Sequence, residues 1–209
     1  ERVERILGYS KPIAKSDEPI LLESMWGTPV RVWLDSQAEP VRKPWTEFFR
    51  HVQVGNRSQP SATWLKTAGN RICEIGEEEV SKRLMQWLGE MEVDPWQADP
   101  NTDTIKGLIW ATAAFDDGRL ASMTGRLCEQ CFKKVAGAGA KSMKLGNACL
   151  HALGATPGER GVAELVRLRG RMKYVQARQQ LEKALNAAAE RAGLSVDDQV
   201  EELGQTVGQ

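Results

Sequence analysis

The segments "GLIWATAAFDDGRLASMTGRLCEQCFKK" (residues 107–134) and "GNACLHALGATPGERGVAELVRLRGRMK" (residues 146–173) decide the fold of this 209-residue chain. Both have the same order: a helix of small residues, a turn with Asp or Pro and Gly, and a longer helix that ends in basic residues. Their first glycines lie roughly 40 residues apart, the period of helical-pair repeats of the HEAT and armadillo type. The sequence therefore predicts an all-α fold, a HEAT/armadillo-like α-solenoid.

Apolar periodicity predicts helices on either side of these segments as well. Ser61 can cap a helix whose apolar residues recur at a spacing of three and four as far as Gly76. Further helices are predicted over 77–88, 104–115, 118–135, 141–153, 158–172 and 174–192. The loop 89–103, with two prolines, separates the helix over 77–88 from the later ones. Because the connections between the helices from residue 104 onward are short, we expect these successive helices to be antiparallel neighbours.

The chain divides by composition into three parts. Residues 1–60 contain most of the nine prolines and are predicted to be irregular, with short helices or extended pieces. Within them, "VRVWL" (30–34) is predicted to be a short strand or extended segment, and "WTEFFRHV" (45–52) a helix. Residues 61–203 are predicted to form the helical-repeat domain, and residues 204–209 a flexible tail.

Composition indicates the class of protein and its compartment. An apolar content of 41% and a charged content of 27% are ordinary for a globular protein. The apolar runs fall short of the roughly 18–20 residues that cross a bilayer, and no secretory signal opens the chain, so we expect a cytoplasmic protein without membrane contact. The absence of an initiator methionine leads us to expect a piece of a longer protein.

The net charge of zero hides an uneven distribution. Residues 118–178 hold twelve Lys and Arg but three acidic residues, so the remainder of the chain is acidic. Such a basic segment can attract nucleic acid, acidic lipid or an acidic protein, or it can pair with acidic residues of its own chain. The sequence leaves these alternatives open.

The stretch "KKVAGAGAKSMKLGNACLHALG" (133–154) suggests a phosphate-binding element in the middle of this basic segment. A nucleotide-binding P-loop is excluded because the glycines required before Lys141 and Ser142 are absent, and the dinucleotide fingerprint fails on spacing. A helix-hairpin-helix-like turn over 133–146 fits better, because amides at a helix N-terminus suit a phosphate. The same glycines also suit a tight turn between helices with no ligand, which is the favoured interpretation.

The candidate anion-binding or nucleic-acid-binding residues are the two glycines of this turn and the cations in and after it. They are Gly137, Gly139, Lys133, Lys134, Lys141, Lys144, Arg167, Arg169, Arg171 and Lys173.

Cysteine, histidine and tryptophan residues are predicted to pack in the core rather than to do chemistry. Four cysteines are too few for a disulfide framework in a chain of this length, so we expect reduced thiols. Cys128, Cys131, Cys149 and His151 suggest a zinc site, but their helical positions favour core packing. Trp64, Trp87 and Trp110 fall at core spacing, whereas the sequence does not assign Trp26, Trp33, Trp45 and Trp96. No catalytic residue, metal ligand or cofactor is predicted.

The segments 60–88, 104–154 and 165–203 resemble the helical region of a large bacterial family whose members are often described as relatives of a molybdate-metabolism regulator. Many members also carry a WGR domain, for which this chain shows no signature. The resemblance covers about two-thirds of the chain and depends on the order of short sequence segments rather than on a catalytic motif. It implies a HEAT-like helical region within a longer protein and points weakly towards transcription or DNA.

We therefore expect a non-enzymatic helical-repeat scaffold that binds a macromolecular partner, either another protein or the rest of its parent protein. The alternative is a nucleic-acid-binding module that uses a basic face and the turn at 133–146. A third interpretation, an enzyme acting on nucleic acid, is kept because some DNA glycosylases have helical-repeat bodies. No small-molecule substrate is identified.

Overall fold

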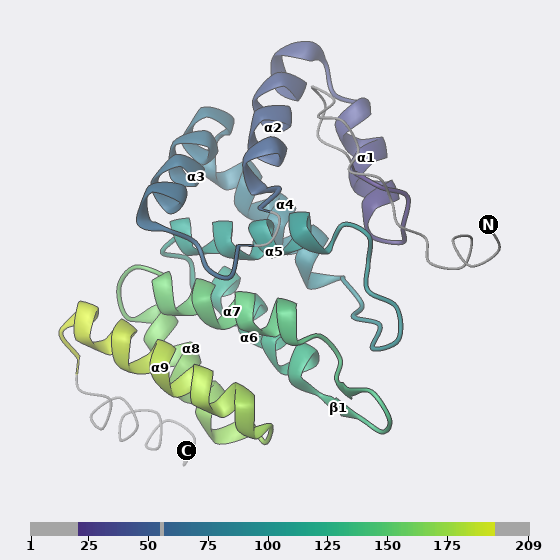
Figure 1. Ribbon diagram of the computed structural model, residues 1–209. Helices are drawn as coiled ribbons and strands as arrows, with labels where there is room; N and C mark the ends of the chain where they lie inside the picture. The colour runs from purple at the N-terminus through teal and green to yellow at the C-terminus, as the bar shows by residue number, and fades with distance from the viewer. Residues whose placement is uncertain (1–20, 55–56, 195–209) are drawn as a thin grey trace, which may run out of the picture.

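The chain is mainly helical over the residues that its computed structural model describes, 21–54 and 57–194 (Figure 1). That part of the chain contains nine α-helices, one 3-10 turn and one two-stranded hairpin. The expected all-α class is therefore confirmed. The tail predicted at 204–209 lies outside the described residues, as do 1–20. No helix in the described ranges is both long and apolar enough to cross a membrane.

The helices begin and end close to where apolar periodicity places them from residue 61 onward. The predicted helix over 118–135 ends early, at Phe132, because a β-hairpin follows it. The elements are α1 (Gly27–Asp35), α2 (Glu39–Val52), α3 (Ala62–Ile75), α4 (Glu77–Gly89), α5 (Thr102–Ala111), η1 (Thr112–Ala114), α6 (Gly118–Phe132), β1 (Lys134–Val135), β2 (Gly139–Ala140), α7 (Met143–Ala155), α8 (Arg160–Arg171) and α9 (Val175–Ala192).

The expected strand or extended segment at residues 30–34 is wrong, because these residues lie within α1. Val30, Val32 and Leu34 alternate with other residues as in a strand. Only Val30 and Leu34 of these three are buried, however, and Val32 is 64% exposed. A spacing of four places the two buried residues on one face of a helix, which α1 packs against α2.

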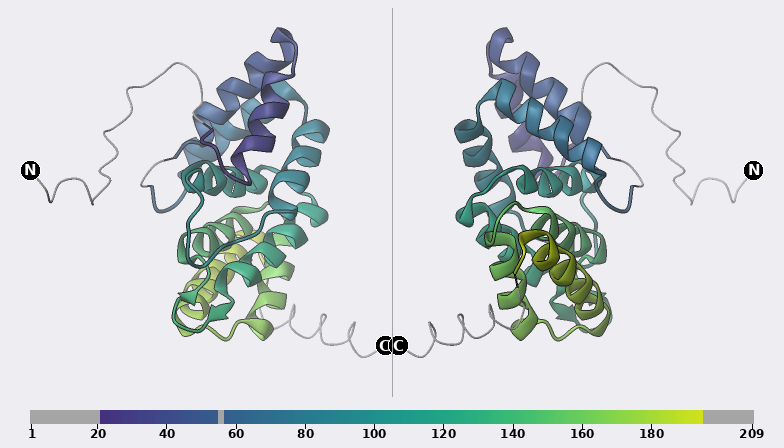
Figure 2. Two further views of the ribbon diagram at one scale, coloured as in Figure 1. Left: turned by 90° about the vertical axis from the view of Figure 1, so that its right-hand side faces the viewer. Right: turned by 90° about the vertical axis from the view of Figure 1, so that its left-hand side faces the viewer.

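The helices from α3 onward pack in two rows. One row consists of α3, α5, α7 and α9, and the other of α4, α6 and α8, so that each helix contacts the next one of its own row. At the start of the chain, α2 packs against both α3 and α5. Figures 1 and 2 show the resulting stack, with α1 and α2 at one end and α8, α9 and the hairpin at the other.

An aromatic cluster joins α1 and α2 to α4. The ring of Trp45 makes edge contacts with the rings of Trp33 and Trp87, at centroid distances of 5.0 and 5.4 Å, and also contacts Phe48 and Phe49. Such aromatic pairs add roughly 0.5–1.5 kcal/mol each beyond the burial of their area. Residues from both sides of position 60 therefore share one core.

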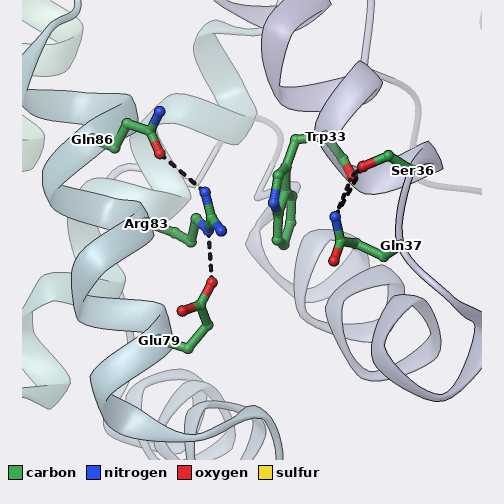
Figure 3. A network of polar contacts seen from close by, with 6 residues as sticks. All are labelled: Trp33, Ser36, Gln37, Glu79, Arg83 and Gln86. Atoms are coloured by element: carbon green, nitrogen blue, oxygen red, sulfur yellow. Dashed lines mark hydrogen bonds and ion pairs between the residues drawn. The ribbon is translucent and has the colours of Figure 1, made fainter.

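A polar network closes the same junction at the surface (Figure 3). The guanidinium carbon of Arg83 on α4 lies 4.5 Å from the centroid of the Trp33 ring on α1. Glu79 and Gln86 accept hydrogen bonds from this guanidinium, at 2.7 and 3.1 Å, and so hold it over the ring. On the α1 side, the Gln37 side chain donates to the Trp33 carbonyl oxygen at 2.9 Å. The network gives Trp33 a structural role.

Gly107 allows α5 to approach α2 more closely than any larger residue would permit. A Cβ atom at this position would lie 1.9 Å from the carbonyl oxygen of Val52, the last residue of α2. Backbone atoms of a packed helix cannot move away without disturbing the contacts that they hold.

We predict that Gly107→Ala lowers the free energy of unfolding by about 1–3 kcal/mol or more, because the new methyl group overlaps the α2 backbone. The matched control is Gly69→Ala on α3, where a Cβ has no neighbour within 4 Å. Alanine in a helix interior is favoured over glycine by about 1 kcal/mol, so this control should keep or raise stability. Urea unfolding followed by circular dichroism measures both; equal midpoints for the two variants would contradict the close approach.

Candidate functional site

A groove of about 810 Å³ lies at the hairpin end of the stack, between the last turns of α6 and the connection from α8 to α9. We call it the basic groove. Its lining residues are Arg126, Glu129, Gln130, Phe132, Lys133, Lys134, Arg171, Met172, Lys173, Tyr174, Val175 and Gln176.

The charge of the basic groove is strongly positive. Five of its lining residues are cations, and all five are exposed: Arg126, Lys133, Lys134, Arg171 and Lys173. The single acidic lining residue is Glu129, which already pairs with Arg167 at 2.5 Å and with Arg171 at 3.7 Å. A concave surface lined by charges of one sign concentrates the field and attracts a polyanion.

The hairpin positions one wall of this groove. Gly137 and Gly139 have φ values of +80° and +83°, the left-handed conformation that glycine adopts without strain. They let the chain reverse so that Lys134 pairs with Ala140, and Val135 with Gly139, in antiparallel register. Lys133 and Lys134 therefore follow the end of α6 directly, and the hairpin fixes the path of their backbone.

Residues 133–146 form this β-hairpin and the start of α7, instead of the tight helix-to-helix turn that the sequence suggests. The amide of Lys141 donates to the Lys133 carbonyl oxygen at 3.2 Å, and the amide of Ser142 donates to the Cys131 carbonyl oxygen at 2.9 Å. The Ser142 hydroxyl in turn accepts from the Leu145 amide at 3.3 Å and caps α7. The amides of Lys141, Ser142 and Leu145 are therefore occupied within the fold.

Three of the cations proposed from the sequence do not line the basic groove and are ion-paired with acidic residues. Lys144 pairs with Asp103 at 2.6 Å. Arg169 pairs with Glu182 at 3.1 Å. Arg167 bridges two carboxylates and lines no part of the groove.

Six of the twelve cations in residues 118–178 are ion-paired, several of them with acidic residues outside that segment, such as Asp103 and Glu182. Within the described part of the chain, the other six make no ion pair, and four of those six line the basic groove. The six are Arg126, Lys133, Lys134, Lys141, Lys173 and Arg178. Of the predicted cations, the structure thus brings Lys133, Lys134, Arg171 and Lys173 together.

Arg126, Tyr174 and Phe132 are groove residues that sequence reasoning missed. Arg126 lies seven residues, or two helical turns, before Lys133, the residue that caps the end of α6. That spacing could have indicated Arg126. The contact between the rings of Tyr174 and Phe132 depends on how α8 and α9 pack, so no local sequence pattern predicts it.

Arg167 holds α8 to α6. Its guanidinium bonds to Glu164 at 2.6 Å and to Glu129 of α6 at 2.5 Å. Hydrogen bonding to Glu164 raises the pKa of Arg167 against the opposing effect of burial, and Glu129 adds to the increase. Glu164 itself is buried, so its carboxylate depends on this partner.

The cysteines of the suggested zinc set lie in the core. Cys128, Cys131 and Cys149 are fully buried. Burial raises the pKa of Cys149 well above its usual range, with hydrogen bonds from Cys128 and Cys131 acting in the same direction, so it stays a neutral thiol. Among the residues that the structure describes, no three His, Cys, Asp or Glu side chains are placed to hold a metal ion.

A second, smaller cavity of about 390 Å³ lies beside His51 at the end of α2. The His51 ring stacks on Trp64 with centroids 4.7 Å apart, and its Nε2 donates to the Trp64 carbonyl oxygen at 3.0 Å. Burial lowers the pKa of His51, and the positive charges of Arg71 and Arg57 lower it further against the effect of that hydrogen bond. His51 is therefore a neutral packing residue in the folded state.

We predict that Arg167→Met lowers the free energy of unfolding by about 1–3 kcal/mol, because the buried Glu164 carboxylate loses its charged partner. Adding Glu164→Gln to this variant should restore part of the loss, since the uncompensated charge is then gone. The control is Arg178, which is exposed and makes no ion pair with any residue that the structure describes, so Arg178→Met should change stability by no more than about 0.5 kcal/mol. Equal stability of the two single variants would contradict the bridging role.

We predict that His51 makes the fold less stable at acidic pH. Its pKa is lowered by folding, so the unfolded chain binds the proton more readily, and stability falls as the pH drops below about 6.5. His51→Gln keeps a donor for the Trp64 carbonyl but cannot titrate, so it should lose less stability than the wild type between about pH 7.5 and about pH 5.5. Urea midpoints at the two pH values measure this difference. An unchanged pH dependence in the variant would show that His51 is not held neutral.

Comparison with family models, with curated proteins and with solved structures gave no match for this chain. The resemblance to the bacterial family related to the molybdate-metabolism regulator therefore stays a prediction. Any functional conclusion depends on the geometry and charge of the site itself.

Proposed function

We propose that this protein is a non-enzymatic helical-repeat scaffold that binds the phosphate backbone of nucleic acid in its basic groove. The observation that carries the proposal is the gathering of five exposed cations around one concave surface. The acidic residue in that surface is already neutralised by arginines. Phosphate contacts by Lys and Arg supply most of the affinity of non-specific nucleic-acid binding.

The order of helical contacts supports the repeat organisation in this proposal. The α5–α6 pair and the α7–α8 pair contain the two similar sequence segments, and corresponding helices of the pairs stack on one another. Helix α9 continues the row of α5 and α7 and would act as a cap for the array. The last turns of α6 line the groove together with the end of α8 and the connection that follows it, which are equivalent places in the two pairs.

Ion pairing distinguishes most of the groove cations from most other cations of the basic segment. A lysine that is free in solution gains more from a phosphate than one that must first leave a carboxylate, because breaking the existing ion pair offsets the new contact. Lys133, Lys134 and Lys173 have no ion pair to break within the described part of the chain, so a phosphate contact is not offset in this way. The proposed interface thus uses only part of the twelve-cation segment and lies at the hairpin end of the stack of helices.

A protein partner is the second candidate, and one observation favours it. Within the described residues, four of the six exposed large hydrophobic side chains fall between positions 22 and 41, around α1 and α2. They are Leu22, Met25, Val32 and Val41. Exposed apolar side chains of this kind suit contact with another protein, at the end of the stack opposite the basic groove.

We predict that the double variant Lys133→Glu, Lys134→Glu binds DNA at least about tenfold more weakly than the wild type at low salt, because two phosphate contacts become repulsive. The dependence of log K on log salt should also become shallower by about one for each lost contact. Fluorescence anisotropy with a labelled single strand and a labelled duplex, at two salt concentrations, measures both quantities.

The matched control is Lys66→Glu, Lys82→Glu, which makes the same change in net charge on α3 and α4. Both of these lysines are exposed and lie outside the groove. Only a small loss of affinity is expected for this pair. An equal loss in the two double variants would show that net charge, rather than the groove, attracts the DNA; absence of any binding at low salt would overturn the proposed function.

A further inference from the structure

We infer that the basic groove selects single-stranded over duplex nucleic acid, with an unpaired base stacking on Tyr174 while the surrounding cations hold the backbone. This inference rests on the proposed function and adds the class of nucleic acid to it. It starts from the partly exposed aromatic ring of Tyr174, a side chain in the groove that phosphate binding does not require.

The ring of Tyr174 is positioned so that a base can stack on it. It is the residue before α9, it lines the groove, and it is partly exposed. Its ring lies nearly parallel to the ring of Phe132, with an interplanar angle of 20° and centroids 6.4 Å apart. Phe132 is itself buried, and its ring packs closely against Gly146. A Cβ at position 146 would lie 2.6 Å from an atom of this ring. Tyr174 therefore rests on a ring that cannot move freely.

The cations lie around this ring as a single strand requires. Lys173 directly precedes Tyr174 in the chain and Arg171 lies three residues before it, and Lys133 and Lys134 come from the hairpin wall of the same groove. Proteins that bind single strands combine a positive groove for the backbone with aromatic side chains on which bases stack. In a duplex the faces of the bases are covered by their neighbours, so Tyr174 has no base to contact, and only the phosphate contacts remain.

Trp96 does not share this role, although it is the most exposed aromatic side chain in the described residues, at 70%. Its ring lies beside the hairpin tip, 3.4 Å from the position of a Cβ on Gly137, and it lines no part of the groove. The loop that carries it also contains Glu92 and Asp94, whose carboxylates repel phosphate. Trp96 therefore offers a matched control for an exposed ring at the same end of the molecule.

The test compares the affinity for an oligothymidylate of about a dozen nucleotides with that for a duplex of the same length. For the wild type we expect tighter binding of the single strand, by roughly tenfold. Tyr174→Leu keeps an apolar contact with Phe132 but offers no aromatic face, so it should abolish this difference while duplex affinity stays within about twofold. Tyr174→Phe should retain the difference, and Trp96→Ala should leave both affinities unchanged.

Two results would overturn the inference. One is an equal loss of single-strand and duplex affinity in Tyr174→Leu, which would mean that the ring supports the groove without contacting a base. The other is a preference for the single strand that Trp96→Ala removes and Tyr174→Leu does not. Failure of the proposed function gives a different result, because the Lys133→Glu, Lys134→Glu variant would then bind both forms as well as the wild type. A thermal melt of each variant verifies that it is folded.

Discussion

The contact between Gly125 of α6 and Glu164 of α8 holds together the end of the molecule on which the proposed function depends. A Cβ at position 125 would lie 1.8 Å from a carboxylate oxygen of Glu164, so a buried carboxylate occupies the space that a side chain would take. Glu164 needs a cation there, and Arg167 supplies it while also reaching Glu129 on α6. Packing and charge thus fix the same pair of helices, and the basic groove lies between the last turns of α6 and the connection that follows α8.

This arrangement divides the basic segment into a structural part and a free part. Arg167 and Arg169 of α8 are used inside the fold, against Glu164, Glu129 and Glu182. Four of the six cations of this segment that make no ion pair within the described residues line the basic groove, so the segment's unpaired positive charge is concentrated at one end of the stack. Both alternatives that the sequence left open, self-neutralisation and an exposed basic surface, therefore hold for different residues of the same segment.

Local patterns predicted the helices well and the site only in part. Ser61, Gly76 and the apolar spacing between them are visible in the sequence, and they define α3 as observed. The assignment of residues 30–34 failed because Val30, Val32 and Leu34 suit either period, and only packing against α2 decides between them. Lys133 and Lys134 were found as a charged pair. The pairing of Lys144 with Asp103 and the approach of Tyr174 to Phe132 arise from tertiary packing, which residue type and spacing do not encode.

The most direct measurement of where this protein binds nucleic acid is an NMR titration of its backbone amides with a short single-stranded oligonucleotide. If the basic groove is the binding surface, chemical-shift changes should cluster at residues 126–134 and 171–176 and stay small on α1 and α2. Changes centred on α1 and α2, or spread evenly over the exposed lysines, would contradict the assignment of the groove.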